Sequence, residues 1–383
     1  MTPRERVLAI LNRKKPDMVP WFGDLAYWID YLNDEGLMPE KYKEKTLDKK
    51  ETICQGLASP FTGKGLFDLH DDLGVGFYLQ GYFPFTARYE NVKITENVKG
   101  NKRITIIETP HGNLQEVWEY VYSTHSWGPK EYMIKGYEDL KKLRYLFENT
   151  YYEPDYKLAR DRYEMIGSNG VVLCYLPKSS FMEMVALRAG IEQVTYMLLD
   201  AKEEMEETLS LIEKKHDEAS EIALNSPAEC LMIPENISSE SIGKNFYNLY
   251  MRGYHEKWIK RIREKKKYSF VHLDGTMKGL IRELSDVGFD VIEAITPAPV
   301  GDIEIEDVHK WVNKDTVIWG GIPGGYFTDK VSDKEFDEFV IHVIEIMRSE
   351  PRYVLSVGDQ VVPGSSFERV KRVGELVRQY GKY

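Results

Sequence analysis

Polar side chains with acid–base or metal-binding chemistry follow several strand-like segments of this 383-residue chain, at the point where each segment ends. His272 and Asp274 close one such segment, Glu293 lies at the end of the next, and Asp359 comes just after the last. Imidazole nitrogens and carboxylate oxygens are ligands that zinc accepts, and they also serve as general acids and bases. These four residues are therefore candidate metal ligands, with a metal-free acid–base role for His272 as the alternative.

Glu235 and Asn236 follow an earlier strand-like segment and are candidates for catalysis or substrate binding. Glu293 lies within an apolar run, where an unpaired carboxylate is costly, so its position favours a catalytic role as well. Structural roles compete with these assignments. Asp274 could cap the next helix, Asp359 could anchor a turn, and Glu235 could belong to a helix cap.

Four aromatic side chains early in the chain have the size and chemistry to stack against a substrate ring. They are Trp21, Tyr27, Trp28 and Tyr31. Aromatic residues at helical spacing also build hydrophobic cores, so core packing is the competing interpretation. Substrate binding is the functional prediction for all four.

The chain after about residue 137 alternates between strand-like and helical patterns. Most of the strand-like runs are continuously apolar, as expected for parallel strands that are buried on both faces. Capping residues mark the starts of two late helices, Ser332 with Glu335 and Ser365 with Glu368. The predicted strands are 170–175, 229–233, 268–273, 289–294, 316–320 and 352–357.

Two further strands are predicted earlier, at 18–21 after an opening helix at 3–13, and near 67–73. Helical stretches are predicted around 24–33 and 48–57. With the six later strands the total is eight, which predicts an α/β fold of the (β/α)8 TIM-barrel type; a doubly wound open sheet is the alternative. In a barrel the carboxyl ends of all strands meet at one rim, so that candidate residues far apart in the sequence share one pocket.

The segment 76–125 has a different character, because short β-rich runs alternate with turn residues. The runs are 87–95, 102–108 and 114–121. This pattern predicts an antiparallel β insertion in the N-terminal third, on an early loop of the barrel. Residues 1–383 are then expected to form a single barrel domain that carries this insertion.

The composition is 42% hydrophobic and 30% charged, with a net charge of −11, which is typical of a globular protein outside the membrane. The acidity argues against nucleic-acid binding, which needs a basic surface. Three cysteines without a close pair suit a reducing cytoplasm. No apolar run approaches the ~18 residues of a membrane span, and the N-terminus lacks the apolar core of a signal peptide. We expect a cytoplasmic enzyme that binds neither nucleic acid nor membranes.

Several motifs, taken in order along the chain, resemble the uroporphyrinogen decarboxylase superfamily. The resemblance covers nearly the whole chain, and the order and spacing of the motifs together make it specific. The motifs are Thr2-Pro-Arg-Glu-Arg-Val with Pro16-Asp17, His272-Leu-Asp274-Gly275, Gly288-Phe-Asp290, Gly320-Gly-Ile and Val357-Gly-Asp359-Gln360.

Members of this superfamily decarboxylate tetrapyrroles or transfer methyl groups to and from corrinoid proteins. The decarboxylases carry an arginine-rich segment near the N-terminus, whereas the corresponding segment 21–31 contains no arginine. The thiol-methylating members use a zinc site with two cysteines. By resemblance, the matching positions in this chain carry aspartates instead, Asp274 and Asp359. Because carboxylates leave zinc a harder Lewis acid, oxygen is a better target than sulfur. The resemblance is therefore closest to corrinoid-dependent methyltransferases that demethylate methoxylated compounds.

The resemblance implies a methyltransferase that moves a methyl group from a methoxylated, aromatic substrate to the cobalt of a separate corrinoid protein. Zinc is the metal expected in the site, the corrinoid is supplied by the partner protein, and a homodimer is compatible with the sequence. Two alternatives stay open: a lyase similar to uroporphyrinogen decarboxylase that acts on a carboxylated substrate, and a non-catalytic barrel that binds a tetrapyrrole or corrinoid.

Overall fold

Parallel strands form the centre of the molecule. The computed structural model describes residues 1–43, 64–78 and 82–383. Six of the strands described are hydrogen-bonded in the order β12–β11–β10–β9–β8–β7, and each neighbouring pair is parallel. Their bounds are β7 Leu173–Tyr175, β8 Cys230–Ile237, β9 Tyr268–Leu273, β10 Val291–Ile295, β11 Val317–Pro323 and β12 Tyr353–Gly358.

Two short extended segments close this sheet into a barrel. The first lies beside β12, the second lies beside the first, and the residues just before β7 complete the circle. The contacts are three parallel bridges, Trp21 with Leu355, Phe22 with Gly76, and Phe77 with Gly170. Among the described residues, eight parallel strand positions thus surround one axis, which confirms the predicted TIM barrel and not the open sheet.

Side chains that point into the barrel form an apolar core of their own. Alternate residues of a strand face opposite sides, so one set fills the barrel while the other packs against the helices. Helix α1 (Pro3–Leu11) adds Val7, Ile10 and Leu11 to this interior core and thereby covers one end of it. The strands contribute Phe22, Tyr78, Val171, Leu173, Tyr175, Cys230, Met232, Phe270, Val291, Val317, Trp319 and Val354.

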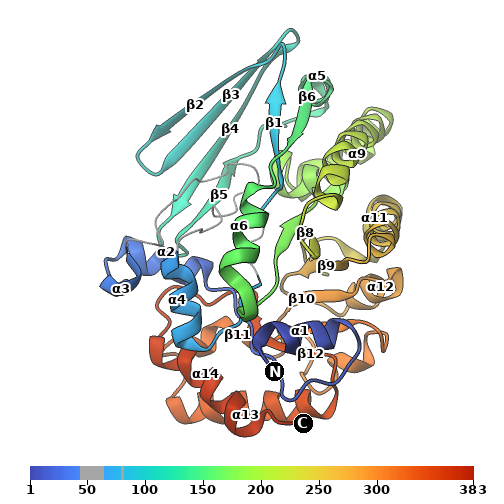
Figure 1. Cartoon of the computed structure of the whole chain (residues 1–383). Helices are drawn as coiled ribbons and strands as arrows, with labels where there is room; N and C mark the ends of the chain where they lie inside the picture. Colours follow the sequence, from blue (N-terminus) through green and yellow to red (C-terminus); the bar gives the residue numbers. More distant parts are fainter. Residues whose placement is uncertain (44–63, 79–81) are drawn as a thin grey trace.

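Helices cover the outside of the barrel (Figure 1). Their buried residues form a second, larger core together with the outward-facing strand residues. The helices are α2 Ala26–Asp34, α3 Glu40–Lys43, α4 Lys64–Leu73, α5 Leu140–Glu148, α6 Lys157–Ile166, α7 Ser180–Met182, α8 Ile191–Asp200, α9 Lys202–Leu224, α10 Gly243–Phe246, α11 Arg252–Glu264, α12 Ile281–Val287, α13 Asp333–Ser349 and α14 Phe367–Tyr380. Short 3-10 or π-helical segments are η1 Tyr137–Asp139, η2 Gly167–Asn169, η3 Glu183–Arg188, η4 Tyr247–Met251, η5 Val308–Lys310 and η6 Gly324–Phe327.

The predicted helix cap is confirmed for α13 but not for α14. A capping box begins α13, since Ser332 Oγ accepts the Glu335 N–H while the Glu335 carboxylate accepts the Ser332 N–H at 2.8 Å. For α14 the predicted cap is wrong by one residue. Ser366, not Ser365, accepts the N–H of Arg369, and the Ser365 carbonyl instead accepts the indole N–H of Trp28.

An antiparallel insertion stands on the early part of the barrel. In Figure 1 its four-stranded sheet projects away from the barrel strands, and the pair β1 and β6 lies beside it. The predicted run 87–95 is two strands, because Asn91 adopts a left-handed turn conformation (φ 53°) between them. The strands are β1 Phe85–Tyr89, β2 Lys93–Lys99, β3 Lys102–Thr109, β4 Gly112–Val121, β5 Ser126–Glu131 and β6 Thr150–Pro154.

The predicted strand near 67–73 is wrong, because this segment belongs to helix α4. Leu66, Leu69 and Leu73 are buried at spacings of three and four residues, which is the period of a helix and not of a strand. The second barrel strand follows it at Gly76–Tyr78 and is very short. The helix predicted at 48–57 lies outside the described residues. Within those residues, no helix is both long and apolar enough to cross a membrane.

Gly170 allows the barrel to close, and this generates a stability prediction. A Cβ atom at this position would lie 1.7 Å from the Phe77 carbonyl oxygen, on the neighbouring strand. Gly170→Ala should therefore lower the free energy of unfolding by about 1–3 kcal/mol, the usual range for an overpacked core. Gly253→Ala is the matched control, since a Cβ atom on this helical glycine would meet nothing within 4 Å. Equal melting temperatures for the two variants would contradict the prediction.

Candidate active site

His272 and Glu293 face each other inside the barrel. They are paired in register on the neighbouring strands β9 and β10, each two residues after a member of the interior core, Phe270 and Val291. Because strand side chains alternate, His272 and Glu293 point inward as well. His272 Nδ1 lies 2.6 Å from Glu293 Oε2, which is the distance of a short, charge-assisted hydrogen bond. Two of the predicted site residues are thus in direct contact.

Glu293 is fully buried, so both of its oxygens need partners. The Tyr78 hydroxyl, from the second barrel strand, donates a hydrogen bond of 2.8 Å to Oε1, and His272 binds Oε2. Tyr78 is itself buried in the interior core. Sequence reasoning missed it, because its strand was placed in the preceding helix. The carboxylate of Glu293 is consequently fixed from two sides and fixes the orientation of the imidazole ring.

Asp359 lies at the second nitrogen of the same ring. It follows β12 with a left-handed backbone (φ 69°), and its Oδ1 lies 3.6 Å from His272 Nε2. That separation makes an ion pair but is too long for a good hydrogen bond. Asp274, just past β9, is close enough for its charge to affect the pKa of both His272 and Asp359. The imidazole therefore lies between carboxylates.

The surrounding charges keep His272 protonated. Burial lowers the pKa of this imidazole, but the charge and hydrogen bond of Glu293, followed by the charges of Asp359 and Asp274, outweigh burial and raise the pKa to about 9. Burial also raises the pKa of Asp359 to about 7; His272 opposes that shift, while Asp274 and Glu293 add to it. At neutral pH the cluster therefore contains an imidazolium that can donate a proton from Nε2.

Asp24 is a further acid of this region that sequence reasoning missed. It is 3% exposed, its Oδ1 accepts the Ala26 N–H at 2.8 Å, and its backbone carbonyl accepts the Val361 N–H. Burial raises the pKa of Asp24 to about 8, and the charges of Asp359 and Glu293 contribute to the shift. A signal was present, since Asp24 follows the first predicted strand as the other candidates follow theirs.

The four predicted aromatic residues have different environments. Tyr27 is half-buried beside the cluster, where its backbone N–H donates to Gln360 and where the charges of Asp359 and Asp24 affect its pKa. Trp21 and Trp28 are at most 5% exposed and belong to the outer core. Trp28 also packs edge-on against Phe367, at 4.6 Å between ring centroids. Their burial favours core packing, the competing interpretation, and substrate stacking by these two tryptophans stays a prediction.

Tyr31 is partly buried and packs edge-on against His125, with 5.2 Å between the ring centroids. His125 itself is 5% exposed, although a histidine in the insertion would ordinarily lie at the surface. Tyr31 therefore connects helix α2 to the insertion. Of the four aromatic candidates, Tyr27 is the one that the structure places beside the acidic cluster.

Glu235 points away from the barrel interior. Its Oε1 accepts the Ser179 N–H at 3.0 Å and lies 2.7 Å from Nε2 of His255, a fully buried residue of helix α11. Cys230 and Met232 of the same strand face the barrel interior. Because side chains alternate along a strand, Glu235, three residues after Met232, faces the surrounding helices. The structure thus separates Glu235 from His272 and gives it a positioning role between strand and helix.

Asn236 is exposed, has a left-handed backbone (φ 53°), and accepts a hydrogen bond of 2.7 Å from Lys178 Nζ. Lys178 is 2% exposed, so its side chain is buried. Burial lowers its pKa to about 8, opposed by the charges of Glu235 and Glu183. Asn236 lies in β8 and Lys178 follows the neighbouring strand β7, and the two form a second polar pair at the rim.

The predicted zinc ligands do not lie close enough together to form a metal-binding site. In the described ranges, no three His, Cys, Asp or Glu side chains converge closely enough to hold a metal ion. Glu293 engages His272 Nδ1, and Asp359 faces Nε2. Since zinc needs at least three protein donors, these positions fit an acid–base cluster better than a zinc ion. Zinc binding stays a prediction.

Comparison with known families identifies one match. The family model described as uroporphyrinogen decarboxylase (URO-D) matches residues 171–380, which is more than half of the chain. This range contains β7 to β12 and with them His272, Glu293 and Asp359. A search of curated proteins found no match.

Among solved structures, a methyltransferase from Methanosarcina mazei is similar over 99% of this chain and 99% of that chain, with a TM-score of 0.60 and 12% identity. At this identity the likeness establishes the fold alone. The GH18 chitinase ChiB of Flavobacterium johnsoniae covers 59% of this chain and 81% of that chain at a TM-score of 0.32 and 12% identity. Since that TM-score is low, the second likeness carries no argument.

Asp24 generates a prediction for the pH dependence of stability. The folded state holds the Asp24 proton up to about pH 8, whereas the ordinary pKa of an aspartate carboxyl is 3.8. Between these values the folded state binds more protons than the unfolded state, so Asp24 lowers the free energy of unfolding as pH rises. Asp24→Asn removes this effect, and its melting temperature relative to the wild type should rise with pH across that window.

The control is Asp315→Asn, which replaces a carboxylate that is 56% exposed and paired with Arg13. Its melting temperature should follow the wild type at each pH. A difference between Asp24→Asn and wild type that stays constant with pH would show that Asp24 is ionised in the folded protein.

Proposed function

Because this chain belongs to the uroporphyrinogen decarboxylase (URO-D) family, we propose that it is an enzyme whose active site is the acidic cluster at the carboxyl end of the barrel. The proposed reaction moves a methyl group from a methoxylated aromatic substrate to the cobalt of a separate corrinoid protein. The observation that carries this proposal is the placement of the His272 ring, with Nδ1 2.6 Å from Glu293 and Nε2 3.6 Å from Asp359.

The charge of the cluster favours this reaction over tetrapyrrole decarboxylation. A porphyrinogen carries several carboxylates, and its binding needs cationic groups. Here Asp274, Glu293 and Asp359 surround a single imidazole, and segment 21–31 contains no arginine. A neutral methoxy compound meets no such repulsion. Its ether oxygen also needs what the cluster offers, a proton donor.

The demethylation step needs two things from its surroundings. A reduced corrinoid, when its carrier protein is docked, supplies the nucleophile that accepts the methyl group. The methyl–oxygen bond breaks and its electron pair stays on oxygen, which becomes a phenolate unless a proton reaches it. In our proposal His272 Nε2 donates that proton, so that the product leaves as a phenol.

Glu293 and Tyr78 act through His272. The hydrogen bond from Nδ1 to Glu293 fixes the ring so that the other N–H is the one available for donation, as in other histidine–carboxylate pairs. Tyr78 holds the second oxygen of Glu293 and keeps the carboxylate in place. Tyr27, half-buried beside Asp24 and Gln360, is the aromatic side chain best placed to contact the substrate ring.

The direct test mixes the purified protein with a reduced corrinoid protein and a panel of methoxybenzoates and methoxyphenols. We expect release of the phenol together with the spectral change of methyl-cobalt formation. His272→Gln should lower kcat by about 10²–10⁴-fold, the usual contribution of a positioned general acid, and should change KM little. His342→Gln is the matched control, since His342 is half-exposed and paired with Glu306 on the outside.

Other outcomes would decide between the alternatives. Activity with N-methyl donors alone would overturn the ether assignment while keeping methyl transfer. Release of CO2 from a carboxylated substrate would make the protein a lyase. A corrinoid or tetrapyrrole that binds without turnover would support a non-catalytic barrel.

Glu293→Gln tests the positioning role through the pH profile. Activity depends on the imidazolium, so it should fall as pH rises through the His272 pKa of about 9. The amide keeps the shape of the side chain but removes the charge that raises this pKa. The high-pH limb of kcat should therefore move to lower pH in the variant. A loss of activity with an unmoved limb would indicate that Glu293 has a structural role alone.

A further inference from the structure

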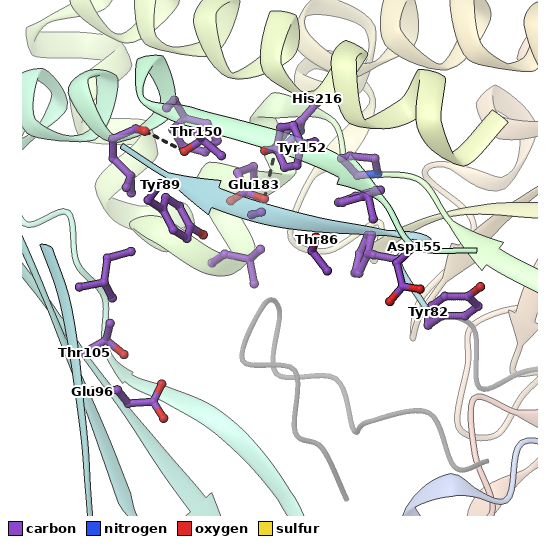
Figure 2. A pocket seen from close by; sticks show the side chains of 18 of the residues that line it. Tyr82, Thr86, Tyr89, Glu96, Thr105, Thr150, Tyr152, Asp155, Glu183 and His216 are labelled. Atoms are coloured by element: carbon purple, nitrogen blue, oxygen red, sulfur yellow. Dashed lines mark hydrogen bonds and ion pairs between the residues drawn. The ribbon is translucent and has the colours of Figure 1, made fainter. Parts of the chain in front are cut away.

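A large cavity lies outside the proposed active site, between the antiparallel insertion and the barrel. Its volume is 1080 Å³. One wall is the sheet β2–β4, and the opposite wall combines β1, β6, helix α5 and the π-helical segment η3 (Figure 2). His272, Glu293 and Asp359 are not among the described residues that line it. The cavity therefore has to be explained separately from the acid–base cluster.

Most of the cavity wall is apolar, and aromatic rings are prominent in it. The rings come from the insertion, from the strand pair β1 and β6, and from helix α5. They include Phe83, Phe85, Tyr89, Trp118, Phe147 and Tyr152. Walls of this kind accept an apolar body, and the faces of aromatic rings also attract cations.

A polar row crosses the sheet in the middle of this apolar wall. Glu96 of β2 is in register with Thr105 of β3, and Thr105 is in register with Glu116 of β4. All three line the cavity, and Figure 2 shows Glu96 and Thr105 projecting from the sheet toward the side of β1. The next row on the same face is apolar, with Ile94 paired to Ile107. The row Glu96–Thr105–Glu116 is thus a localised polar patch.

Thr105 shows that this row lacks part of its hydrogen bonding. Thr105 is 6% exposed, and its hydroxyl has no hydrogen-bond partner among the described residues. Glu116 is also 6% exposed, and burial raises its pKa. Buried hydroxyls and carboxylates in folded proteins almost always have partners. A ligand with N–H groups and a positive charge would give Thr105 the partner it lacks, and it would add to the hydrogen bond that Glu116 already has with the Trp118 side chain.

The opposite wall offers little free positive charge. Arg188 Nε donates to Glu183 at 2.8 Å, and Lys157 is paired with Asp161. These two cations therefore already have carboxylate partners. Six carboxylates line the cavity in the described part of the chain, against these two cations, and one of the six, Glu96, also pairs with Arg103 at 3.8 Å. An anionic ligand would meet net repulsion here, whereas a cation would be attracted.

We propose that this cavity is a second binding site, and that it takes a small protonated amine with an aromatic or branched apolar body. The ammonium group lies against Glu96, Thr105 and Glu116, donating one N–H to the Thr105 hydroxyl and another to the Glu116 carboxylate. The apolar body lies between the aromatic rings. This site is independent of the methyl-transfer proposal, since it uses none of the residues of the acid–base cluster.

The test compares three probes that share one body and differ in charge. Phenethylamine is protonated at neutral pH, 2-phenylethanol is neutral, and 3-phenylpropionate is an anion. Titration calorimetry on the whole protein, without a corrinoid partner, should give one phenethylamine site with a Kd below about 1 mM. The alcohol should bind at least about tenfold more weakly, as expected for the loss of a charge-assisted hydrogen bond. The anion should give no heat of binding.

Variants then locate the site. Glu116→Gln and Thr105→Val should each weaken phenethylamine binding by about tenfold and leave binding of the alcohol less affected. Glu108→Gln is the matched control, since Glu108 is on β3 with the opposite side-chain direction and pairs with Lys93. Equal binding of the three probes, tightest binding of the anion, or no phenethylamine binding to the wild type would each overturn the proposal. Unchanged binding in both cavity variants would overturn it as well.

Discussion

The hydrogen bond between His272 and Glu293 is the interaction around which the barrel end is organised. A carboxylate with no solvent exposure is tolerated only when its oxygens have partners, and Glu293 obtains them from two other strands, through His272 and Tyr78. The same contact that satisfies Glu293 raises the pKa of the imidazole and fixes its orientation. Folding and chemistry therefore depend on one pair, and removing either partner leaves a buried charge or an unrestrained ring.

The alternation of side chains along each strand decides which acidic residues join this pair. Glu293 is two residues after the inward-facing Val291, whereas Glu235 is three residues after the inward-facing Met232. Both follow strand-like runs in the sequence and both are fully buried, yet Glu235 contacts His255 on the helical side. Counting from the inward residues of each strand would have separated them, but apolar runs buried on both faces do not reveal which residues point inward.

Long, continuously apolar strands and strong caps were predictable from the sequence alone. The strand at 268–273 was predicted with the bounds it has, and the capping box at Ser332 is present. The second barrel strand was not predictable in this way, because it spans only a few residues around Gly76 and directly follows an amphipathic helix. Because this strand was not predicted, Tyr78 was not among the candidate site residues. Asp24 follows the first predicted strand as the other candidates follow theirs, but its raised pKa comes from burial, which the sequence does not show.

The acid–base cluster in the barrel and the cavity beside the insertion both contain buried carboxylates, but the partners of these carboxylates differ and so do the roles we propose for them. Glu293 has both oxygens occupied by protein groups, so it cannot bind a ligand without losing a partner, and its effect on chemistry has to pass through His272. In the cavity, Glu116 has the Trp118 side chain as a hydrogen-bond partner and is attracted by Arg188, while Glu183 and Glu96 repel it. The hydroxyl of the neighbouring Thr105 has no partner among the described residues. That arrangement keeps an energetic penalty that a cationic ligand can relieve. The complete hydrogen bonding of Glu293 thus supports a positioning role, and the missing partner of Thr105 next to an open volume supports ligand binding.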